Sequence, residues 1–307
     1  MQTGSGSAAA NGCNMIEALN LPTQSTADGT SEGCEPDIAA VRSVDLGEAL
    51  RKDWIEFWYQ PKIDLRKKQL AGVEVLARVR HPELGILAPD TFLLGAAESE
   101  LVALSEKALA SALATGSDLS KLGLNLRFTV NMPVPALVKL GIADLVCSHR
   151  AQVEHWPGLI IDITEAQIVA NLALVTGIAK RLAHVDVLLA IDDFGRGNSS
   201  LASLKELPFV ELKLDPTFVA DCGTDQVNAP LCKTIIDLAH NFGSAAVAIG
   251  IEKASDALAL TRMGCDIGQG FLFGQPMPAE RFTSLLRQRA AGQGRSMPAG
   301  GDGKPKY

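Results

Sequence analysis

Residues 188–195 read Leu188-Leu189-Ala190-Ile191-Asp192-Asp193-Phe194-Gly195, an apolar run that ends on two adjacent carboxylates and a glycine. Such a run predicts a strand buried on both faces, as the strands of parallel sheets are. Asp192 and Asp193 would then lie at its carboxyl end. Adjacent carboxylates repel each other and are costly to desolvate, so a divalent cation is the simplest neutraliser. The alternative is that they only begin a solvated turn and the next helix.

The same pattern recurs along the chain, where further apolar runs each end on one polar residue: Asn131, Asp162, Lys213, Glu252 and Gln269. Apolar spacing typical of amphipathic helices separates these runs, at residues 171–183, 229–242 and 255–263, and a Pro-Asp signal predicts another helix near 89–98. Alternating strands and helices indicate βα units. The polar residues would then form a ring on one rim of a parallel barrel.

The first two predicted strands, near residues 55–61 and 70–78, are separated by a short polar segment. No crossover helix fits between them, so they should form an antiparallel hairpin. The predicted fold class is therefore α/β, a TIM-like (β/α)8 barrel with an antiparallel first strand.

The chain has 307 residues, whereas an α/β barrel takes about 250. Residues 1–40 are rich in Gly, Ser and acidic residues and have no basic residue; we expect a disordered segment, because little apolar surface is available to offset chain entropy. Residues 291–307 are rich in glycine and are expected to be a flexible tail. The barrel domain is placed at residues 41–290.

Composition indicates a globular protein, with 47% hydrophobic and 21% charged residues. The net charge of -7 argues against a broad DNA- or RNA-binding face. The six cysteines lack metal-ligand spacing, and without a signal peptide they indicate reduced thiols and a cytoplasmic location. No apolar run approaches the roughly 18 residues of a membrane helix, so no membrane partner is expected.

Short motifs follow one another at characteristic spacing: Glu74-Val75-Leu76-Ala77-Arg78, Asn131, Asp162-Ile163-Thr164-Glu165, Asp192-Asp193-Phe194-Gly195, Lys213-Leu214-Asp215 and Gln269-Gly270-Phe271. In order and spacing they resemble the motifs of one bacterial family, the EAL domain of cyclic-di-GMP phosphodiesterases. The resemblance covers about residues 45–290, and the family's Glu-Ala-Leu motif here reads Glu-Val-Leu.

The resemblance implies a barrel that binds cyclic-di-GMP across its carboxyl-terminal rim. In active members two Mg²⁺ or Mn²⁺ ions hold the attacking hydroxide and give linear pGpG, and hard oxygen ligands suit these ions. It implies that Asp193 joins Asp192 at the second metal. The first metal would be held by Glu74, Asn131 and Asp192, and Asp162 stands at a further metal-ligand position.

Further roles follow from the resemblance alone. Lys213 matches the lysine that orients the attacking water, and Gln269 matches a residue that supports the ligand and the metal-bound water. Arg78 matches the arginine that contacts a phosphate, and Gln60 matches a residue on the guanine side. Glu165 matches the glutamate that braces the loop after Asp192 and Asp193.

Two departures from the family pattern bear on activity. Asp162 stands where active members have glutamate, and a carboxylate displaced by one methylene is poorly tolerated in catalysis. Ile249 replaces the first glutamate of the motif that here reads Val247-Ala248-Ile249-Gly250-Ile251-Glu252. An isoleucine can neither bind a metal nor accept a proton, so the rate should fall by orders of magnitude.

Three functions remain open. The favoured one is a catalytically degenerate EAL protein that regulates through a protein partner, senses cyclic-di-GMP and represses gene expression. The second is a weak Mg²⁺- or Mn²⁺-dependent phosphodiesterase in which Glu252 or a water replaces the missing ligand. The third is a transcription regulator like the stand-alone EAL repressors of virulence genes, acting through other regulators because direct DNA binding is disfavoured. Family members often dimerise through the segment matching residues 195–204, so a homodimer is a further expectation.

Overall fold

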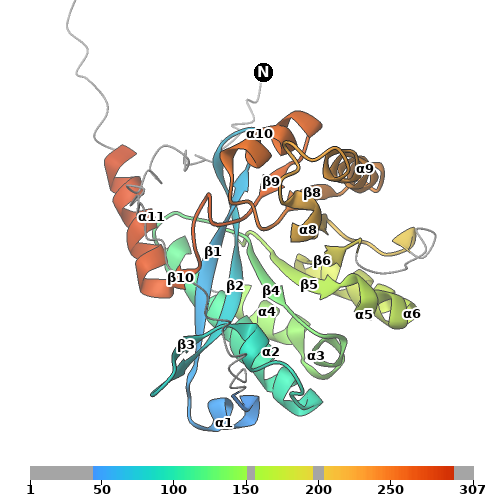
Figure 1. The fold of residues 1–307 in the computed structure, drawn as a ribbon. Helices are drawn as coiled ribbons and strands as arrows, with labels where there is room; N and C mark the ends of the chain where they lie inside the picture. Colours follow the sequence, from blue (N-terminus) through green and yellow to red (C-terminus); the bar gives the residue numbers. More distant parts are fainter. Residues whose placement is uncertain (1–43, 151–155, 196–203, 294–307) are drawn as a thin grey trace, which may run out of the picture.

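The computed structural model describes residues 44–150, 156–195 and 204–293. Its centre is a closed barrel in which each strand hydrogen-bonds to the next and β1 pairs with β2 to complete the ring (Figure 1). The strands of the ring are β1 Ile55–Asp64, β2 Gln69–His81, β4 Phe128–Asn131, β5 Leu159–Thr164, β6 Val187–Phe194, β7 Glu211–Leu214, β8 Ala245–Ala248 and β9 Ile267–Gly268.

Strand β1 is antiparallel to both of its neighbours in the ring, β2 and β9, whereas the other ring pairings are parallel. The predicted barrel with an antiparallel first strand is confirmed. Two short strands lie outside the ring: β3 Gly85–Leu87 pairs with β2, and β10 Met277–Pro278 pairs with β1.

Helices surround the barrel (Figure 1). They are α1 Leu46–Arg51, α2 Glu98–Ser120, α3 Val134–Lys139, α4 Ile142–Arg150, α5 Glu165–Ala170, α6 Leu172–Leu182, α8 Pro216–Val219, α9 Asn228–Asn241, α10 Ala254–Met263 and α11 Ala279–Gln293. The helices predicted at 171–183, 229–242 and 255–263 are confirmed as α6, α9 and α10 within one residue at either end. In α6 the buried residues recur at helical spacing, which explains why periodicity located it.

Two local predictions were wrong. The segment 89–98 is not a helix, because only the 3-10 turn η1 Pro89–Thr91 forms there and Gly95 adopts a left-handed φ of 77°. Helix α2 begins at Glu98. Its first turn is capped because the Glu100 side chain accepts a hydrogen bond from the Ala97 N–H. The strand expected to run to Ile251 instead ends at Ala248, and Gly250 turns the chain with a φ of 75°.

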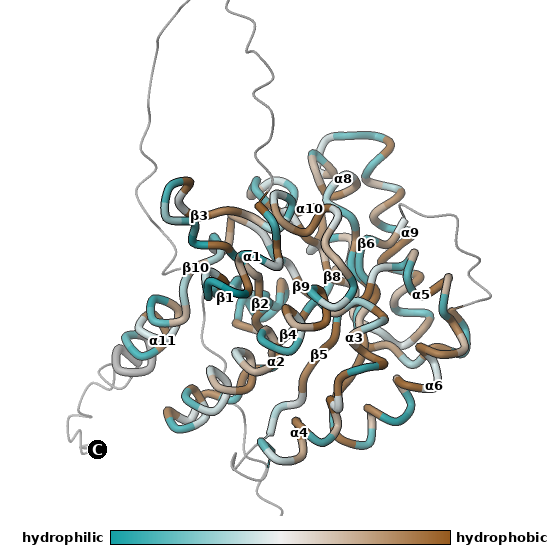
Figure 2. Tube along the Cα trace, turned by 90° about the horizontal axis from the view of Figure 1, so that it is seen from below, coloured by the Kyte–Doolittle hydropathy of each residue, from teal (hydrophilic) through white to brown (hydrophobic). Residues whose placement is uncertain are grey.

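The core lies between the barrel and its helices. Strand β5 is buried from Leu159 to Ile163, and its apolar colouring stands out in the tube of Figure 2. Tyr59 of β1 points to the outside of the barrel, where its ring stacks on Phe282 of α11 and meets Phe128 of β4 edge-on. This packing fixes β1 and leaves its opposite face, which includes Gln60 and Lys62, turned into the barrel.

Some predictions fall outside the described residues. These are the disordered segment 1–40, most of the proposed dimer segment 195–204, and the tail from residue 294 onward; α11 itself continues to Gln293. Within the described part of the chain, no helix has the length and apolar character needed to cross a membrane.

Candidate functional site

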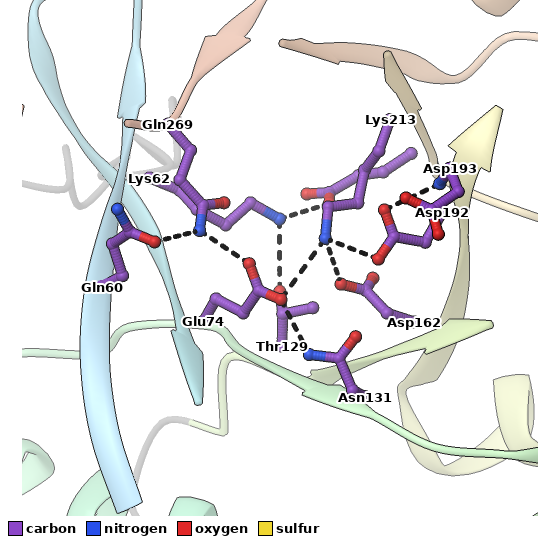
Figure 3. Close-up of polar contacts among 11 residues, drawn as sticks. Gln60, Lys62, Glu74, Thr129, Asn131, Asp162, Asp192, Asp193, Lys213 and Gln269 are labelled. Carbon is purple, nitrogen blue, oxygen red and sulfur yellow. Dashed lines mark hydrogen bonds and ion pairs between the residues drawn. The ribbon is translucent and has the colours of Figure 1, made fainter. Parts of the chain in front are cut away.

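The carboxyl ends of the parallel strands bring polar side chains together at one rim (Figure 3). Alternation along β2 turns Glu74 inward while its neighbours Val73 and Val75 pack outward. Register places Asn131 of β4 beside Asp162 of β5, and Thr164 of β5 beside Asp192 of β6. The strand ends at Asn131, Asp162 and Asp192 therefore lie close together, whereas Glu252 lies in the loop four residues after β8 ends.

Lys213 lies at the centre of this ring. Its Nζ is 2.7 Å from Asp162 Oδ2, 3.2 Å from Asp192 Oδ2 and 3.4 Å from Glu74 Oε1. The lysine is 1% exposed, so its charge is stabilised by these three carboxylates rather than by water.

Glu74 links the lysine to a chain of amides. Asn131 Nδ2 donates to Glu74 Oε1 at 2.8 Å, and Gln269 Nε2 donates to Glu74 Oε2 at 2.6 Å. The same Gln269 nitrogen donates to Gln60 Oε1 at 3.0 Å, and Gln60 in turn donates to the Gly274 carbonyl. These bonds fix the orientation of both oxygens of Glu74.

Burial and the close approach of opposite charges shift the pKa values of Asp162, Glu74 and Lys213. Burial, with smaller contributions from Glu74 and Asp192, raises the pKa of Asp162 to about 7 despite the opposing effect of Lys213. Burial also acts to raise the pKa of Glu74, but Lys213 and the two amide donors hold it below its ordinary value. Burial opposes the charge on Lys213, yet the surrounding carboxylates raise its pKa well above the ordinary value.

The residues at this point fit one divalent cation. Glu74, Asp162 and Asp192 each offer a carboxylate oxygen, and these oxygens lie within 4.8 Å of one another. Asp162 Oδ1 is buried and has no hydrogen-bond partner among the described residues. Against three carboxylates stands one ammonium, which leaves two negative charges in excess. Oxygen ligands and this charge suit Mg²⁺ or Mn²⁺.

Asp193 stands apart from this group. Its backbone has a left-handed φ of 53°, its N–H donates to Asp192 Oδ1 at 2.9 Å, and its carboxylate is not among the three that converge. The turn after Asp193 is bound by the side chain of Glu165, because the Gly195 N–H donates to Glu165 Oε2 at 2.9 Å. Glu165 is buried at the start of α5, directly after β5.

A cavity of about 270 Å³ opens beside Lys213 and Asp192. Ile249, the first residue after β8, lines it, and Glu252 reaches it from the loop that follows. Phe271 also lines it and is 58% exposed. The end of β8 thus presents an apolar residue, whereas its neighbour β7 carries the ammonium of Lys213 and its neighbour β9 is followed by the amide of Gln269.

Arg78 lies further out along β2. Its guanidinium carbon is 5.6 Å from the centre of the Trp58 ring, and Nη1 donates to the Ala77 carbonyl at 2.8 Å. Burial lowers its pKa, with Asp90 acting in the opposite direction. Among the described residues its hydrogen bonds do not reach the carboxylates around Lys213.

A second cavity of about 510 Å³ adjoins the carboxylates on the side of β2 and α2. Leu101, Leu104 and Ala108 of α2 form part of its apolar lining, and Asn131 and Asp162 lie at its polar edge. The charged cluster thus lies between two cavities of different character.

Sequence reasoning missed a buried ion pair below the cluster. Lys62 of β1 binds Glu211 at the start of β7 and donates to Thr129 Oγ1 of β4 at 3.2 Å. Lys62 lies two residues after Gln60, and period two along a strand places both on the inner face. A lysine on the inner face of a barrel strand requires a buried acidic partner, so Lys62 was the residue from which the ion pair could have been predicted.

Comparisons with known proteins agree with the resemblance. Residues 43–276 match the family described as EAL domain. The cyclic di-GMP phosphodiesterase RocR of Pseudomonas aeruginosa is 34% identical over 250 residues, which cover 80% of this chain and 62% of that protein. The bifunctional diguanylate cyclase/cyclic di-GMP phosphodiesterase MucR of the same species is 33% identical, over 79% of this chain and 36% of that protein. The chain thus spans less than two thirds of either relative.

Solved structures give the same result. The phosphodiesterase PaMucR in complex with c-di-GMP superposes with a TM-score of 0.70 at 33% identity, covering 77% of this chain and 97% of that one. The manganese and cyclic-di-GMP complex of Klebsiella pneumoniae BlrP1 superposes with a TM-score of 0.64 at 25% identity, covering 74% and 56%.

Proposed function

The chain belongs to the EAL domain family, and from that membership we propose that it binds cyclic-di-GMP but has lost most or all of the phosphodiesterase activity. The observation that carries the proposal is Ile249. It lines the cavity beside Asp192 and Lys213, at the position where the family motif has a glutamate. Family members with this glutamate use it at the second metal, and isoleucine offers no oxygen for that purpose.

The two cavities support dinucleotide binding. A cyclic dinucleotide has two purine bases on either side of a phosphate-containing ring, and the rim has two cavities on either side of the carboxylate cluster. The relative PaMucR was solved with c-di-GMP. We propose that one base enters the apolar cavity beside α2 and the other lies near Phe271.

The chemistry open to the site is restricted. A divalent cation bound by Glu74, Asp162 and Asp192 would supply charge neutralisation and an acidic bound water. Lys213 would hold those carboxylates and the water in position, and Gln269 would orient Glu74. Three carboxylates among the described residues line the cavity beside Ile249, those of Glu74, Asp192 and Glu252. Because Glu74 and Asp192 would be bound to the cation, Glu252 is the one left to take the proton of the attacking water.

The biological output we propose is regulation by contact. A domain that binds cyclic-di-GMP without consuming it reports the nucleotide concentration, and a protein partner can respond to that state. Control of gene expression through such a partner, in the direction of repression, is the form that we propose. The net charge of -7 favours a protein partner over direct DNA contact.

A weak phosphodiesterase is the second candidate, and Glu252 is the observation in its favour. It lines the same cavity as Ile249 and is exposed. Its position in a loop, four residues after β8 ends, gives it reach without a fixed orientation. Loose placement of a catalytic carboxylate reduces the rate strongly, so any turnover should be slow.

Calorimetric titration of cyclic-di-GMP with Ca²⁺ and then Mg²⁺, followed by chromatography for pGpG, tests both candidates. We expect binding and no efficient turnover. The double variant Ile249→Glu, Asp162→Glu should raise the rate by at least tenfold, and Glu74→Ala should abolish any residual rate. Efficient pGpG formation by the unmodified protein would overturn the proposal. A residual rate that survives Glu74→Ala would come from another source.

A further inference from the structure

The charge around Lys213 determines how many metal ions the rim can hold. Resting on the proposed function above, we propose that this chain binds one divalent cation at the rim, not the two that its family implies. The ion would lie among the carboxylates of Glu74, Asp162 and Asp192, and the position bordered by Ile249 would stay without metal.

The evidence for the first ion is geometric. Oxygens from the three carboxylates lie within 4.8 Å of one another, a spacing that one ion can bridge. Asp162 is 2% exposed, and its Oδ1 has no hydrogen-bond partner among the described residues. A buried carboxylate oxygen without a donor is costly unless it binds a cation. The amides of Asn131 and Gln269 hold the two carboxylate oxygens of Glu74 in place.

The evidence against a second ion is the lack of ligands. Neither Asp193 nor Glu252 contributes an oxygen to the converging group in the part of the chain that the structure describes. β8 lies beside β7, the strand of Lys213, and the first residue after β8 is Ile249. Its side chain presents only carbon to the cavity, and a divalent cation of this class requires about six oxygen ligands.

Charge balance also favours one divalent cation at the rim. The three carboxylates carry three negative charges, and Lys213 with one divalent cation supplies three positive charges. A second divalent cation would leave two positive charges in excess, and one in excess even if Asp193 were recruited. A glutamate at position 249 together with Asp193 would restore neutrality for two ions. The site is therefore balanced for one ion as the sequence stands.

The test is the stoichiometry of Mn²⁺ binding in the absence of nucleotide. Calorimetric titration at pH 8 and electron paramagnetic resonance of free Mn²⁺ should both give one ion per chain in the unmodified protein. Ile249→Glu should raise the number of bound ions to two. The control is Ile249→Gln, because glutamine has nearly the size of glutamate but no charge, and it should leave the number at one. Asp162→Asn should weaken the single site at least tenfold.

Each outcome decides the proposal. Two ions in the unmodified protein, or none, would overturn it, and these measurements need no variant. One ion in both the unmodified protein and a folded Ile249→Glu variant would overturn the role given to Ile249. Because nucleotide is absent, a failure here is separate from a failure of the proposed function, which would appear as no binding of cyclic-di-GMP.

Discussion

At the scale of single residues, the site is dominated by the imbalance between one buried ammonium and three carboxylates. Lys213 contacts all three, and Asp162, the more buried of its two nearest partners, retains an oxygen with no donor. The resemblance to the family implies a glutamate in active members at the position of Asp162. The shorter side chain still reaches Lys213 at 2.7 Å, so the substitution preserves the ion pair.

The raised pKa of Asp162 predicts a pH dependence of stability. Burial, opposed by Lys213 and assisted by Glu74, raises the folded-state pKa to about 7, whereas an unfolded aspartate titrates near 3.9. Between about pH 4 and pH 7 the folded protein keeps a proton that the unfolded chain has released, so this stabilisation is present below pH 4 and lost as pH rises to 7. We expect the unfolding free energy of the unmodified protein, relative to Asp162→Asn, to fall across this range.

Urea unfolding at several pH values in the presence of EDTA measures the effect. The exposed Asp144 of α4 provides the control: Asp144→Asn removes a surface carboxylate and leaves Asp162 in place, so the fall caused by Asp162 should remain and the curve should run parallel to that of the unmodified protein. If the Asp162→Asn curve is also parallel, the raised pKa of Asp162 is refuted.

At the scale of elements, the site depends on the loops that follow the strands more than on the strands themselves. The segment after β9 carries Gln269 and passes directly over the backbone of Ile251. Gly270 makes this approach possible: a Cβ there would lie 2.1 Å from the Ile251 oxygen and 2.3 Å from its nitrogen. Two rim loops are thereby joined without intervening side chains.

We expect Gly270→Ala to destabilise the protein by about 1 to 3 kcal/mol, the usual cost of overpacking, because both clashing partners are backbone atoms. Gly177→Ala is the matched control, since a Cβ at Gly177 in α6 meets nothing within 4 Å and alanine is the better helix former by about 1 kcal/mol. Urea unfolding should therefore show shifts of opposite sign. Equal shifts would show that the close approach at Gly270 is unimportant.

At the scale of the whole molecule, the barrel is closed by β1, the antiparallel strand. Lys62 of β1 forms an ion pair with Glu211 of β7 in the barrel interior. The pair links two strands that are not neighbours, because β9 and β8 lie between β1 and β7 in the ring. The pair lies at the end of the barrel away from the rim, beside a cavity of about 170 Å³. Both side chains are buried, so each depends on the other for neutralisation.

Breaking this pair should test its role in closure. Lys62→Met leaves Glu211 buried without its cation, and we expect a loss of about 3 to 5 kcal/mol of unfolding free energy. The double variant Lys62→Met, Glu211→Leu should recover much of this loss, because a hydrophobic pair of similar volume removes the unpaired charge. Thermal or urea unfolding of the three proteins measures the coupling. Additive losses would show that the two residues act independently.

Much of the fold was predictable because its signals are local. Apolar runs ending on polar residues located the strands, and helical spacing located α6, α9 and α10. The failures were also local. Pro89 and Asp90 begin only a 3-10 turn, and the apolar run to Ile251 contains Gly250, whose φ of 75° ends the strand early. Apolar character alone does not distinguish a strand from the loop that follows it.

The sequence by itself determined the fold class, the order of the strands and the residue types at their carboxyl ends, because periodicity and turn residues act over a few positions. It also determined that Ile249 interrupts the ring of polar strand ends. Only the tertiary structure decided that Lys213 is shared by three carboxylates, that Lys62 is paired with Glu211, and that Asp193 stays outside the converging group. These contacts join strands far apart in the chain, and their distances follow from the register and closure of the barrel, which no local pattern encodes.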